Sequence, residues 1–275
     1  MNFFHFKKIL SESAQYLKSE LPQSPKIGII LGTGYYSLAD ELKNSKIIPY
    51  SSIPGFPKSS LPGQISELIF GEWKGKNILI FKKRFHYYEG FTPLESTIPV
   101  WLVKELGAEY LILTTASGGV NPKLREGDLM LIDDQINLTN KNPLMEIPIE
   151  ERNPLFLNLS SLYNAQLKEE AIKIAQKNGV EVKKGIYAGV IGPTYETLAE
   201  IKMLEKLGVD AVGMSLIFES IIACYLNLKT FAISVISNKC DFHYMSSLSH
   251  EKVIENVEKK VPDLKKILGE LVKVI

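Results

Sequence analysis

Short apolar segments alternate with amphipathic ones along most of this chain, and this alternation constrains the fold more than any other feature. The apolar segments include residues 27–31, 111–113, 186–191 and 231–236, and glycines or small polar residues follow them. Strands that are apolar on both faces are typical of parallel or mixed sheets with helices on both sides. The sequence therefore predicts an α/β fold with a mixed, mostly parallel central β-sheet flanked by helices.

Capping residues and apolar spacing predict where several helices begin and end. Residues 92–95 (TPLE) combine a threonine N-cap, a proline at the first helical position and a capping-box glutamate, and the helix is expected to end at Gly107. A second helix is predicted over residues 197–208, and the helical tail from Ser249 is expected to be interrupted at Pro262. The apolar residues expected on one face of the second helix are Leu198, Ile201, Leu204 and Leu207.

Composition excludes some classes of protein. The 275 residues are 45% hydrophobic and 23% charged with a net charge of +1, so bulk charge favours neither a nucleic-acid nor a membrane partner. No repeat or Pro/Gly/Ser-rich linker divides the chain, which predicts a single domain over residues 1–275. Cys224 and Cys240 form no C-x-x-C pair, and the first twenty residues lack a signal-peptide apolar core, so we expect a reducing, cytoplasmic setting.

The residues after each predicted strand are the candidates for a functional site, because ligands collect at the carboxyl ends of strands in such sheets. These residues are small hydroxyls, glycines, an arginine, a histidine, a carboxylate and an amide. In chain order they are Gly32-Thr33-Gly34, Arg84, His86, Thr115-Ala116-Ser117, Tyr195-Glu196, Met214-Ser215 and Asn238.

One part of this set suits an anion. Arg84 can bind a phosphate through two parallel N–H···O bonds, His86 adds a donor, and glycine-flanked hydroxyls with free backbone N–H groups complete a cradle. Each small residue taken alone is more simply explained as a turn or cap. Residues 32–37 (GTGYYS) are a poor dinucleotide fingerprint and no P-loop lysine follows, so the cradle is predicted to hold free phosphate.

The other part suits a heterocyclic base. Glu196 can accept N–H bonds, Asn238 can donate and accept, and Tyr195 can stack on a ring. Alternatively, Glu196 stabilises a helix N-terminus and Asn238 is a turn residue. The position of all three after strands favours one shared pocket.

Together these motifs resemble those of the trimeric purine nucleoside phosphorylases. RFHYYEG, TTASGGVNP, EGDLMLIDDQIN, GPTYETLAEIKMLEKLGVDAVGMS and ISNK occur in the order and spacing of that family, between about Gly28 and His250. The resemblance implies a nucleoside phosphorylase-like fold, a homotrimer in the cytoplasm, and reversible phosphorolysis of purine nucleosides. It implies no metal and no organic cofactor, with inorganic phosphate as co-substrate.

The resemblance also assigns roles to residues. It implies catalytic roles for His86, Glu196 and Asn238. The residues implied to bind phosphate are Thr33, Arg84, His86, Ala116 and Ser215. Those implied to bind ribose are Tyr88, Met214, His250 and, from a neighbouring subunit, Phe156. Those implied to bind the base are Tyr195, Glu196 and Asn238. Because alternate side chains of an extended segment share a face, Arg84, His86 and Tyr88 are expected to point into one pocket, with Phe85 and Tyr87 packing opposite.

Some positions depart from the family pattern. Thr33 stands where serine is usual and Gln64 where histidine is usual. Thr115, in place of a frequent asparagine, is similar to the methylthioadenosine phosphorylase branch, and residues 214–220 (MSLIFES) lack a common proline. That branch carries acidic residues at the positions of Asn238 and Cys240, because a 6-amino group needs acceptors. Asn238 instead suits a 6-oxopurine, which predicts inosine and guanosine as substrates.

Three other functions are compatible with parts of this pattern. A methylthioadenosine phosphorylase would turn over 6-aminopurine nucleosides faster than inosine. A nucleoside-binding module would bind inosine without releasing base, and a nucleoside hydrolase would release base without regard to phosphate.

Overall fold

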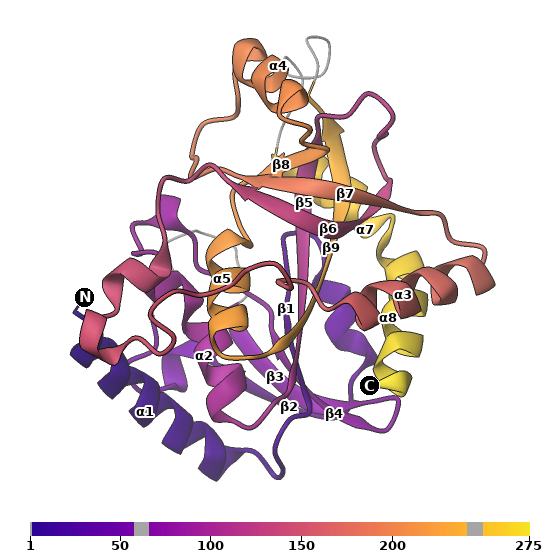
Figure 1. Ribbon diagram of the computed structural model, residues 1–275. Helices are drawn as coiled ribbons and strands as arrows, with labels where there is room; N and C mark the ends of the chain where they lie inside the picture. Colours follow the sequence, from indigo (N-terminus) through magenta and orange to yellow (C-terminus); the bar gives the residue numbers. More distant parts are fainter. Residues whose placement is uncertain (1, 58–65, 241–249) are drawn as a thin grey trace.

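A single sheet runs through the computed structural model of the chain, which describes residues 2–57, 66–240 and 250–275. Within these residues the sheet has nine strands in the order β2-β3-β4-β1-β5-β8-β7-β6-β9 (Figure 1). The strands are β1 (Ile27–Ile30), β2 (Lys43–Pro49), β3 (Glu67–Trp73), β4 (Lys76–Phe81), β5 (Tyr110–Gly119), β6 (Leu129–Asn137), β7 (Val182–Gly189), β8 (Ala211–Gly213) and β9 (Lys229–Lys239).

The sheet is mixed and partly closed. β1 runs parallel to β4 and β5, and β5–β9, β6–β7 and β7–β8 are also parallel. The pairs β2–β3, β3–β4, β5–β8 and β6–β9 are antiparallel. Because β5 pairs with both β8 and β9, strands β5, β8, β7, β6 and β9 form a ring, from which β1, β4, β3 and β2 extend. The fold class predicted from the sequence is confirmed.

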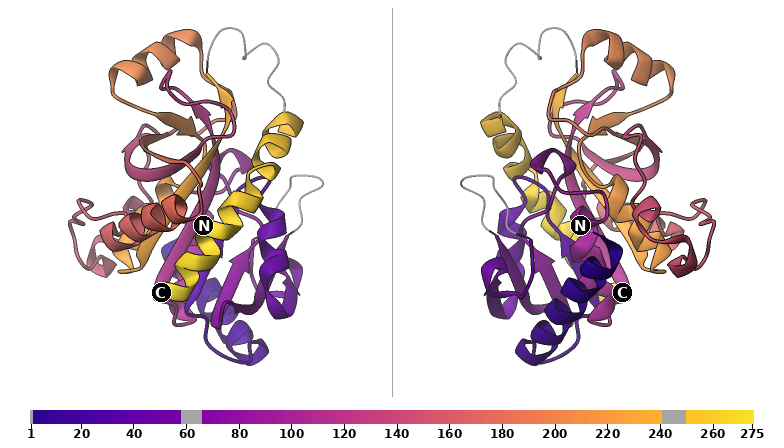
Figure 2. Two further views of the ribbon diagram at one scale, coloured as in Figure 1. Left: turned by 90° about the vertical axis from the view of Figure 1, so that its right-hand side faces the viewer. Right: turned by 90° about the vertical axis from the view of Figure 1, so that its left-hand side faces the viewer.

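Helices cover both faces of the sheet. α1 (Phe3–Glu20), α2 (Ile98–Glu105) and α5 (Ile217–Tyr225) pack into one core, and α3 (Ala165–Lys177), α7 (His250–Glu258) and α8 (Val261–Val274) into another. Figure 2 shows α8 across one face and α1 on the opposite side. Short 3-10 helices are η1 (Tyr36–Glu41), η2 (Tyr50–Ser52), η3 (Tyr87–Glu89), η4 (Glu95–Thr97), η5 (Pro143–Glu146) and η6 (Ile149–Glu151).

β5 shows why the central strands must be apolar on both faces. Leu111 and Leu113 lie in the core beneath α1, α2 and α5, while Ile112 between them lies in the core beneath α3 and α8. Successive side chains of a strand point to opposite faces, so each face of β5 needs its own apolar residues. No helix in the described residues is long and apolar enough to cross a bilayer.

The predicted cap at residues 92–95 forms, but the helix begins later. The Thr92 N–H donates to Glu95 Oε2 at 2.7 Å and the Glu95 N–H to Thr92 Oγ1 at 3.2 Å, the reciprocal bonds of a capping box. These bonds close a turn leading into η4, and α2 starts only at Ile98, with Pro99 rather than Pro93 in its first turn. The interruption near Pro262 is confirmed, between α7 and α8.

The prediction of one apolar face running along α4 (Leu198–Lys206) to Leu207 is wrong. Ile201 and Leu204 are buried, but Leu198 is 40% and Leu207 is 51% exposed. At 3.6 residues per turn, residues nine apart lie on opposite sides of a helix, so this spacing cannot form one stripe. Only Ile201 and Leu204 reach the small hydrophobic cluster under α4.

The close approach of β1 to α2 predicts a stability effect. A Cβ added at Gly28 would lie 2.3 Å from Val103 Cγ2, so Gly28→Ala is expected to lower the free energy of unfolding by about 1–3 kcal/mol. Gly269→Ala in α8 is the matched control. Its added Cβ would meet nothing nearer than 3.4 Å, and alanine in a helix is expected to stabilise by about 0.5–1 kcal/mol. Urea unfolding followed by circular dichroism measures both, and a Gly28→Ala variant as stable as the parent would contradict the packing argument.

Candidate active site

A pocket opens where the carboxyl ends of β1, β4, β5, β8 and β9 meet the β7–α4 connection and α7. It collects residues that are far apart in the sequence. The lining residues are Gly32, Thr33, Arg84, His86, Tyr88, Thr115, Ala116, Ser117, Gly118, Tyr195, Glu196, Val212, Gly213, Met214, Ser215, Ser237, Asn238, Cys240 and Val253. Such a collection at strand ends is the usual place for a ligand in an open α/β sheet.

Arg84 lines the pocket, and its guanidinium is held from two sides. The side chain is 3% exposed; Nε donates to Glu219 Oε1 at 2.7 Å and Nη1 to the Thr114 carbonyl at 2.9 Å. Within the described residues Nη2 is buried and has no hydrogen-bond partner. A buried cationic donor without a partner is costly, and an anion in the pocket would satisfy it.

His86 lies beside a buried carboxylate. Glu89 Oε1 is 2.8 Å from His86 Nδ1 and accepts the His86 backbone N–H at 3.1 Å. An ionised carboxylate can only accept, so pairing with an ionised Glu89 requires the ring proton on Nδ1 and leaves Nε2 as an acceptor rather than the donor expected from the sequence. Burial lowers the pKa of His86 although Glu89 opposes this effect, so the imidazole is neutral at pH 7.

The sequence predicted an extended segment through Arg84, His86 and Tyr88, and this prediction is wrong for the second half of the segment. Extended backbone ends at His86, and η3 (Tyr87–Glu89) follows, closed by Gly90 at φ 96°. Tyr88 still lines the pocket, because the turn stacks its ring on that of His86 with centroids 4.6 Å apart and 14° between the planes. The 3-10 turn, rather than strand alternation, therefore places Tyr88. Phe85 is buried among aromatic rings, as expected.

Ser215 is anchored by its neighbours at the end of β8. Its hydroxyl lies 2.9 Å from Thr115 Oγ1, and the Tyr187 hydroxyl donates to its carbonyl at 3.2 Å. Burial raises the pKa of Tyr187 to about 12, so that hydroxyl stays protonated. The next residue, Leu216, has φ 74°, which is strained for a branched side chain. Its N–H donates to Glu219 Oε2 at 2.9 Å, which helps to hold this conformation.

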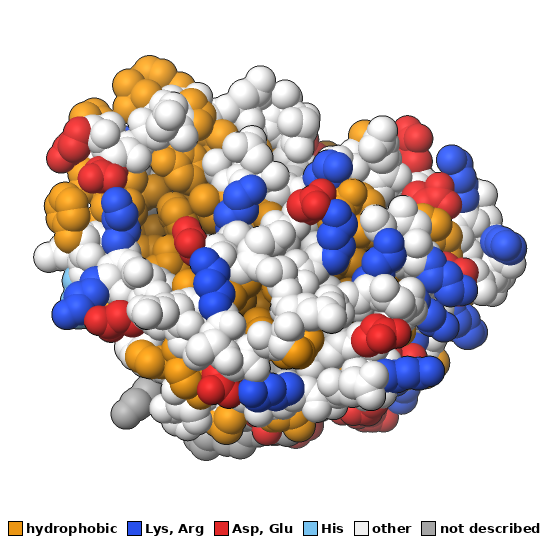
Figure 3. Space-filling view, turned by 90° about the horizontal axis from the view of Figure 1, so that it is seen from below, with side chains coloured by type: hydrophobic (Ala, Val, Ile, Leu, Met, Phe, Trp, Pro, Cys, Tyr) orange, Lys and Arg blue, Asp and Glu red, His pale blue; other side chains and the backbone are white. Residues whose placement is uncertain are grey.

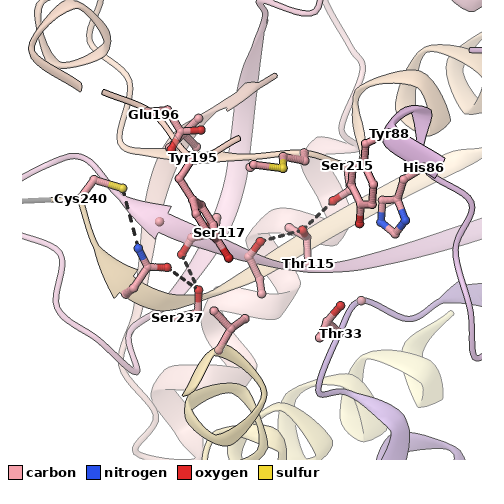
Figure 4. A pocket seen from close by; sticks show the side chains of 18 of the residues that line it. Thr33, His86, Tyr88, Thr115, Ser117, Tyr195, Glu196, Ser215, Ser237 and Cys240 are labelled. Atoms are coloured by element: carbon pink, nitrogen blue, oxygen red, sulfur yellow. Dashed lines mark hydrogen bonds between the residues drawn. The ribbon is translucent and has the colours of Figure 1, made fainter. Parts of the chain in front are cut away.

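The opposite end of the pocket carries an oriented amide and a carboxylate. Ser237 Oγ donates to Asn238 Oδ1 at 2.9 Å, and Asn256 Nδ2 holds the Ser237 carbonyl at 2.9 Å. Burial raises the pKa of the partly buried Glu196 carboxyl. Figure 4 shows Cys240, Tyr195 and Glu196 toward one side of the pocket, with His86, Tyr88 and Thr33 toward the other. The pocket thus has one end suited to an anion and another suited to a polar heterocycle.

The structure does not place two of the residues assigned by resemblance in this lining, for different reasons. Phe156 is 88% exposed and away from the pocket of its own chain. His250 begins α7, but its side chain lies outside the described structure, as does Gln64. The remaining predicted residues line one pocket: Thr33, Arg84, His86, Tyr88, Ala116, Tyr195, Glu196, Met214, Ser215 and Asn238.

Sequence reasoning missed the side chains that orient this lining. Glu89, Glu219 and Ser237 contact His86, Arg84 and Asn238 respectively. The spacing of Glu89 from His86 was a usable signal, because residues three apart meet across one helical turn. No comparable signal connects Arg84 to Glu219. No group of three His, Cys, Asp or Glu side chains in the described ranges is placed to hold a metal ion.

Comparisons with known proteins agree on one family. Residues 26–273 match the model of the Phosphorylase superfamily. The chain is 40% identical over 264 residues to purine nucleoside phosphorylase 1 of Geobacillus stearothermophilus, covering 96% of each chain. It is 42% identical over 253 residues to purine nucleoside phosphorylase 1 of Bacillus subtilis, covering 92% of this chain and 93% of the relative.

Solved structures give the same result. Isoform 2 of purine nucleoside phosphorylase from Schistosoma mansoni, in complex with cytosine and ribose-1-phosphate, superposes with a TM-score of 0.91 at 38% identity, covering 99% of this chain and 96% of that one. Schistosoma mansoni purine nucleoside phosphorylase in complex with inosine gives a TM-score of 0.92 at 32% identity, covering 100% and 97%. The chain therefore belongs to the purine nucleoside phosphorylases of the phosphorylase superfamily.

Proposed function

We propose that this enzyme catalyses the reversible phosphorolysis of 6-oxopurine nucleosides, inosine and guanosine, to free base and ribose 1-phosphate, with 2′-deoxynucleosides as further substrates. The observation that carries the proposal is the pocket itself. At one end it has an Arg84 nitrogen with no partner among the described residues, and at the other the oriented amide of Asn238 with Glu196. A nucleoside and a phosphate ion need these two ends at once. The ribose would lie between them, against Tyr88 and Met214.

The anion end supports phosphate as the nucleophile. Arg84 Nη2, the hydroxyls of Thr33 and Ser215, and the Ala116 N–H would hold the phosphate oxygens. Neutral His86 would accept the hydroxyl proton of monohydrogen phosphate at Nε2, which increases negative charge on the attacking oxygens. An ion held in this way attacks the anomeric carbon from a fixed position, so no protein nucleophile is needed.

The base end supports stabilisation of the leaving purine. As the glycosidic bond breaks, its electron pair moves onto the base, N7 takes up a proton from solvent, and Asn238 would hydrogen-bond that position. Ionised Glu196 would accept the N1–H of a 6-oxopurine, a donor that a 6-aminopurine lacks. Relatives from Schistosoma mansoni have been solved with inosine and with adenosine, so the choice of a 6-oxo group rests on Asn238 and Glu196 of this chain.

The proposal includes the assembly and the setting of the enzyme. We propose a cytoplasmic homotrimer that uses phosphate as co-substrate and needs no metal or organic cofactor. Exposed Phe156 would complete the ribose site of a neighbouring subunit. Figure 3 shows hydrophobic side chains gathered on one side of the lower face, and the exposed apolar residues of the 143–159 region include Met145, Ile149, Leu155 and Phe156. Light scattering tests the trimer.

Purine release from inosine, guanosine, adenosine and methylthioadenosine, each with and without phosphate, tests the function. We expect phosphate-dependent release from inosine and guanosine only. Release from the two 6-aminopurine nucleosides instead would overturn the base specificity, and release that ignores phosphate would indicate a hydrolase. Binding of inosine without release in saturating phosphate would indicate a binding module.

Arg84→Ala tests the anion end. The variant loses charge-assisted hydrogen bonds, so the KM for phosphate is expected to rise about 10- to 100-fold with little change in the KM for inosine. Because Arg84→Ala also leaves the buried Glu219 carboxylate unpaired, Arg84→Ala/Glu219→Gln should be assayed beside it. An unchanged affinity for phosphate in both variants would show that the anion site lies elsewhere.

Asn238→Ala tests the base end. The variant is expected to lower kcat about 100- to 1000-fold, as loss of a hydrogen bond to developing negative charge does, without changing the circular dichroism spectrum. Asn77→Ala, at the half-buried start of β4, is the control and should retain full activity. A near-normal kcat for Asn238→Ala would remove this residue from the mechanism.

A further inference from the structure

Lys83 places a buried ammonium group next to the phosphate site. Its side chain is 2% exposed, and within the described residues Nζ is buried with no hydrogen-bond partner. Its backbone is fixed, because the Tyr50 hydroxyl donates to the Lys83 carbonyl at 2.7 Å. Burial of a lysine is costly and needs compensation by a nearby negative charge.

That compensation comes from Glu89. Lys83 Nζ lies 3.6 Å from Glu89 Oε2, while Glu89 Oε1 contacts His86 Nδ1. The Glu89 side chain has no exposed surface, so water does not stabilise its charge. The three side chains therefore contact one another in sequence: the Lys83 ammonium, the Glu89 carboxylate and the His86 imidazole, which borders the pocket.

The surrounding charges explain why the Glu89–His86 pair needs a cation beside it. Arg84 and Glu219 also act on His86, but they already pair with each other. Among the described residues, Tyr88 is a further titratable neighbour, and its pKa is raised chiefly by burial, so it stays neutral. Loss of the Lys83 charge would make protonation of Glu89 easier and would leave more negative charge beside a bound phosphate. Both changes would disturb His86.

We propose that Lys83 is a positioning residue of the phosphate site: its ammonium group keeps Glu89 ionised, and Glu89 holds His86 with the proton on Nδ1 and Nε2 open to phosphate. This inference rests on the proposed function. The lysine does not line the pocket, so it acts through Glu89 rather than by touching the substrate.

The pH profile of Lys83→Met tests this role. A positive charge disfavours proton uptake by the Glu89–His86 pair, so its removal raises the pKa at which the pair takes up a proton. The acid limb of kcat/KM for phosphate should therefore move up by about one pH unit, with about a tenfold loss at pH values on that limb and a smaller loss at pH 7. The KM for inosine should change little. An acid limb that coincides with that of the parent enzyme would overturn the proposal.

Three variants separate this role from mere packing. Lys83→Arg keeps the charge and should restore activity to within about threefold of the parent. Lys82→Met is the matched control, because the neighbouring Lys82 pairs with a different carboxylate, Glu67. In a Glu89→Gln background Lys83→Met should cause no further loss, whereas an equal loss in both backgrounds would show that Lys83 does not act through Glu89.

Two measurements keep the test independent of folding and of the proposed function. Nitrogen-15 NMR of the parent protein should show His86 protonated on Nδ1, and protonation on Nε2 alone would overturn the proposal even if Lys83→Met does not fold. Calorimetric titration with inorganic phosphate, without nucleoside, should show weaker binding to Lys83→Met. If the parent is active and Lys83→Met binds phosphate as tightly as the parent, the role of Lys83 is contradicted but the proposed function is not. If the parent binds phosphate but releases no base, the proposed function is contradicted instead.

Discussion

The buried ion pair between Arg84 and Glu219 is the interaction on which the rest of the site depends. It joins the segment after β4 to the first turn of α5, although the two residues lie 135 positions apart in the chain. Glu219 also accepts the N–H of Leu216, which holds the strained backbone next to Ser215. One carboxylate thus positions both the guanidinium and the turn that presents a hydroxyl. A buried pair of this kind adds little net stability, but breaking it leaves an uncompensated charge.

Charge is balanced locally at the anion end before any substrate arrives. Glu219 lies against Arg84, and Glu89 lies between Lys83 and His86. The pocket therefore offers donors to an anion without a large excess of buried charge, which would be costly to desolvate. At the other end the polar groups are oriented by neutral partners, such as the Ser237 hydroxyl on Asn238. This difference suits an anion at one end and a neutral ring at the other.

Much of the site was predictable because strand ends are predictable. Each apolar run predicts a strand, and the residues after it must lie at one edge of the sheet, as Thr33, Arg84 and Ser215 do. The errors came from local geometry that short patterns do not determine. Tyr88 reaches the pocket through a 3-10 turn, and α4 exposes Leu198 because its apolar spacing does not follow the helical period.

The sequence by itself determined the layered α/β fold, the strand ends that carry polar residues and the family to which the motifs belong, because these depend on periodicity and on short motifs. Only the tertiary structure decided which carboxylate serves which cation. Glu219 could not be assigned to Arg84, nor Ser237 to the Asn238 amide, from spacing in the chain. Such pairs depend on the register and twist of strands that are distant in sequence, and on burial, which turns an ordinary lysine such as Lys83 into part of a coupled group.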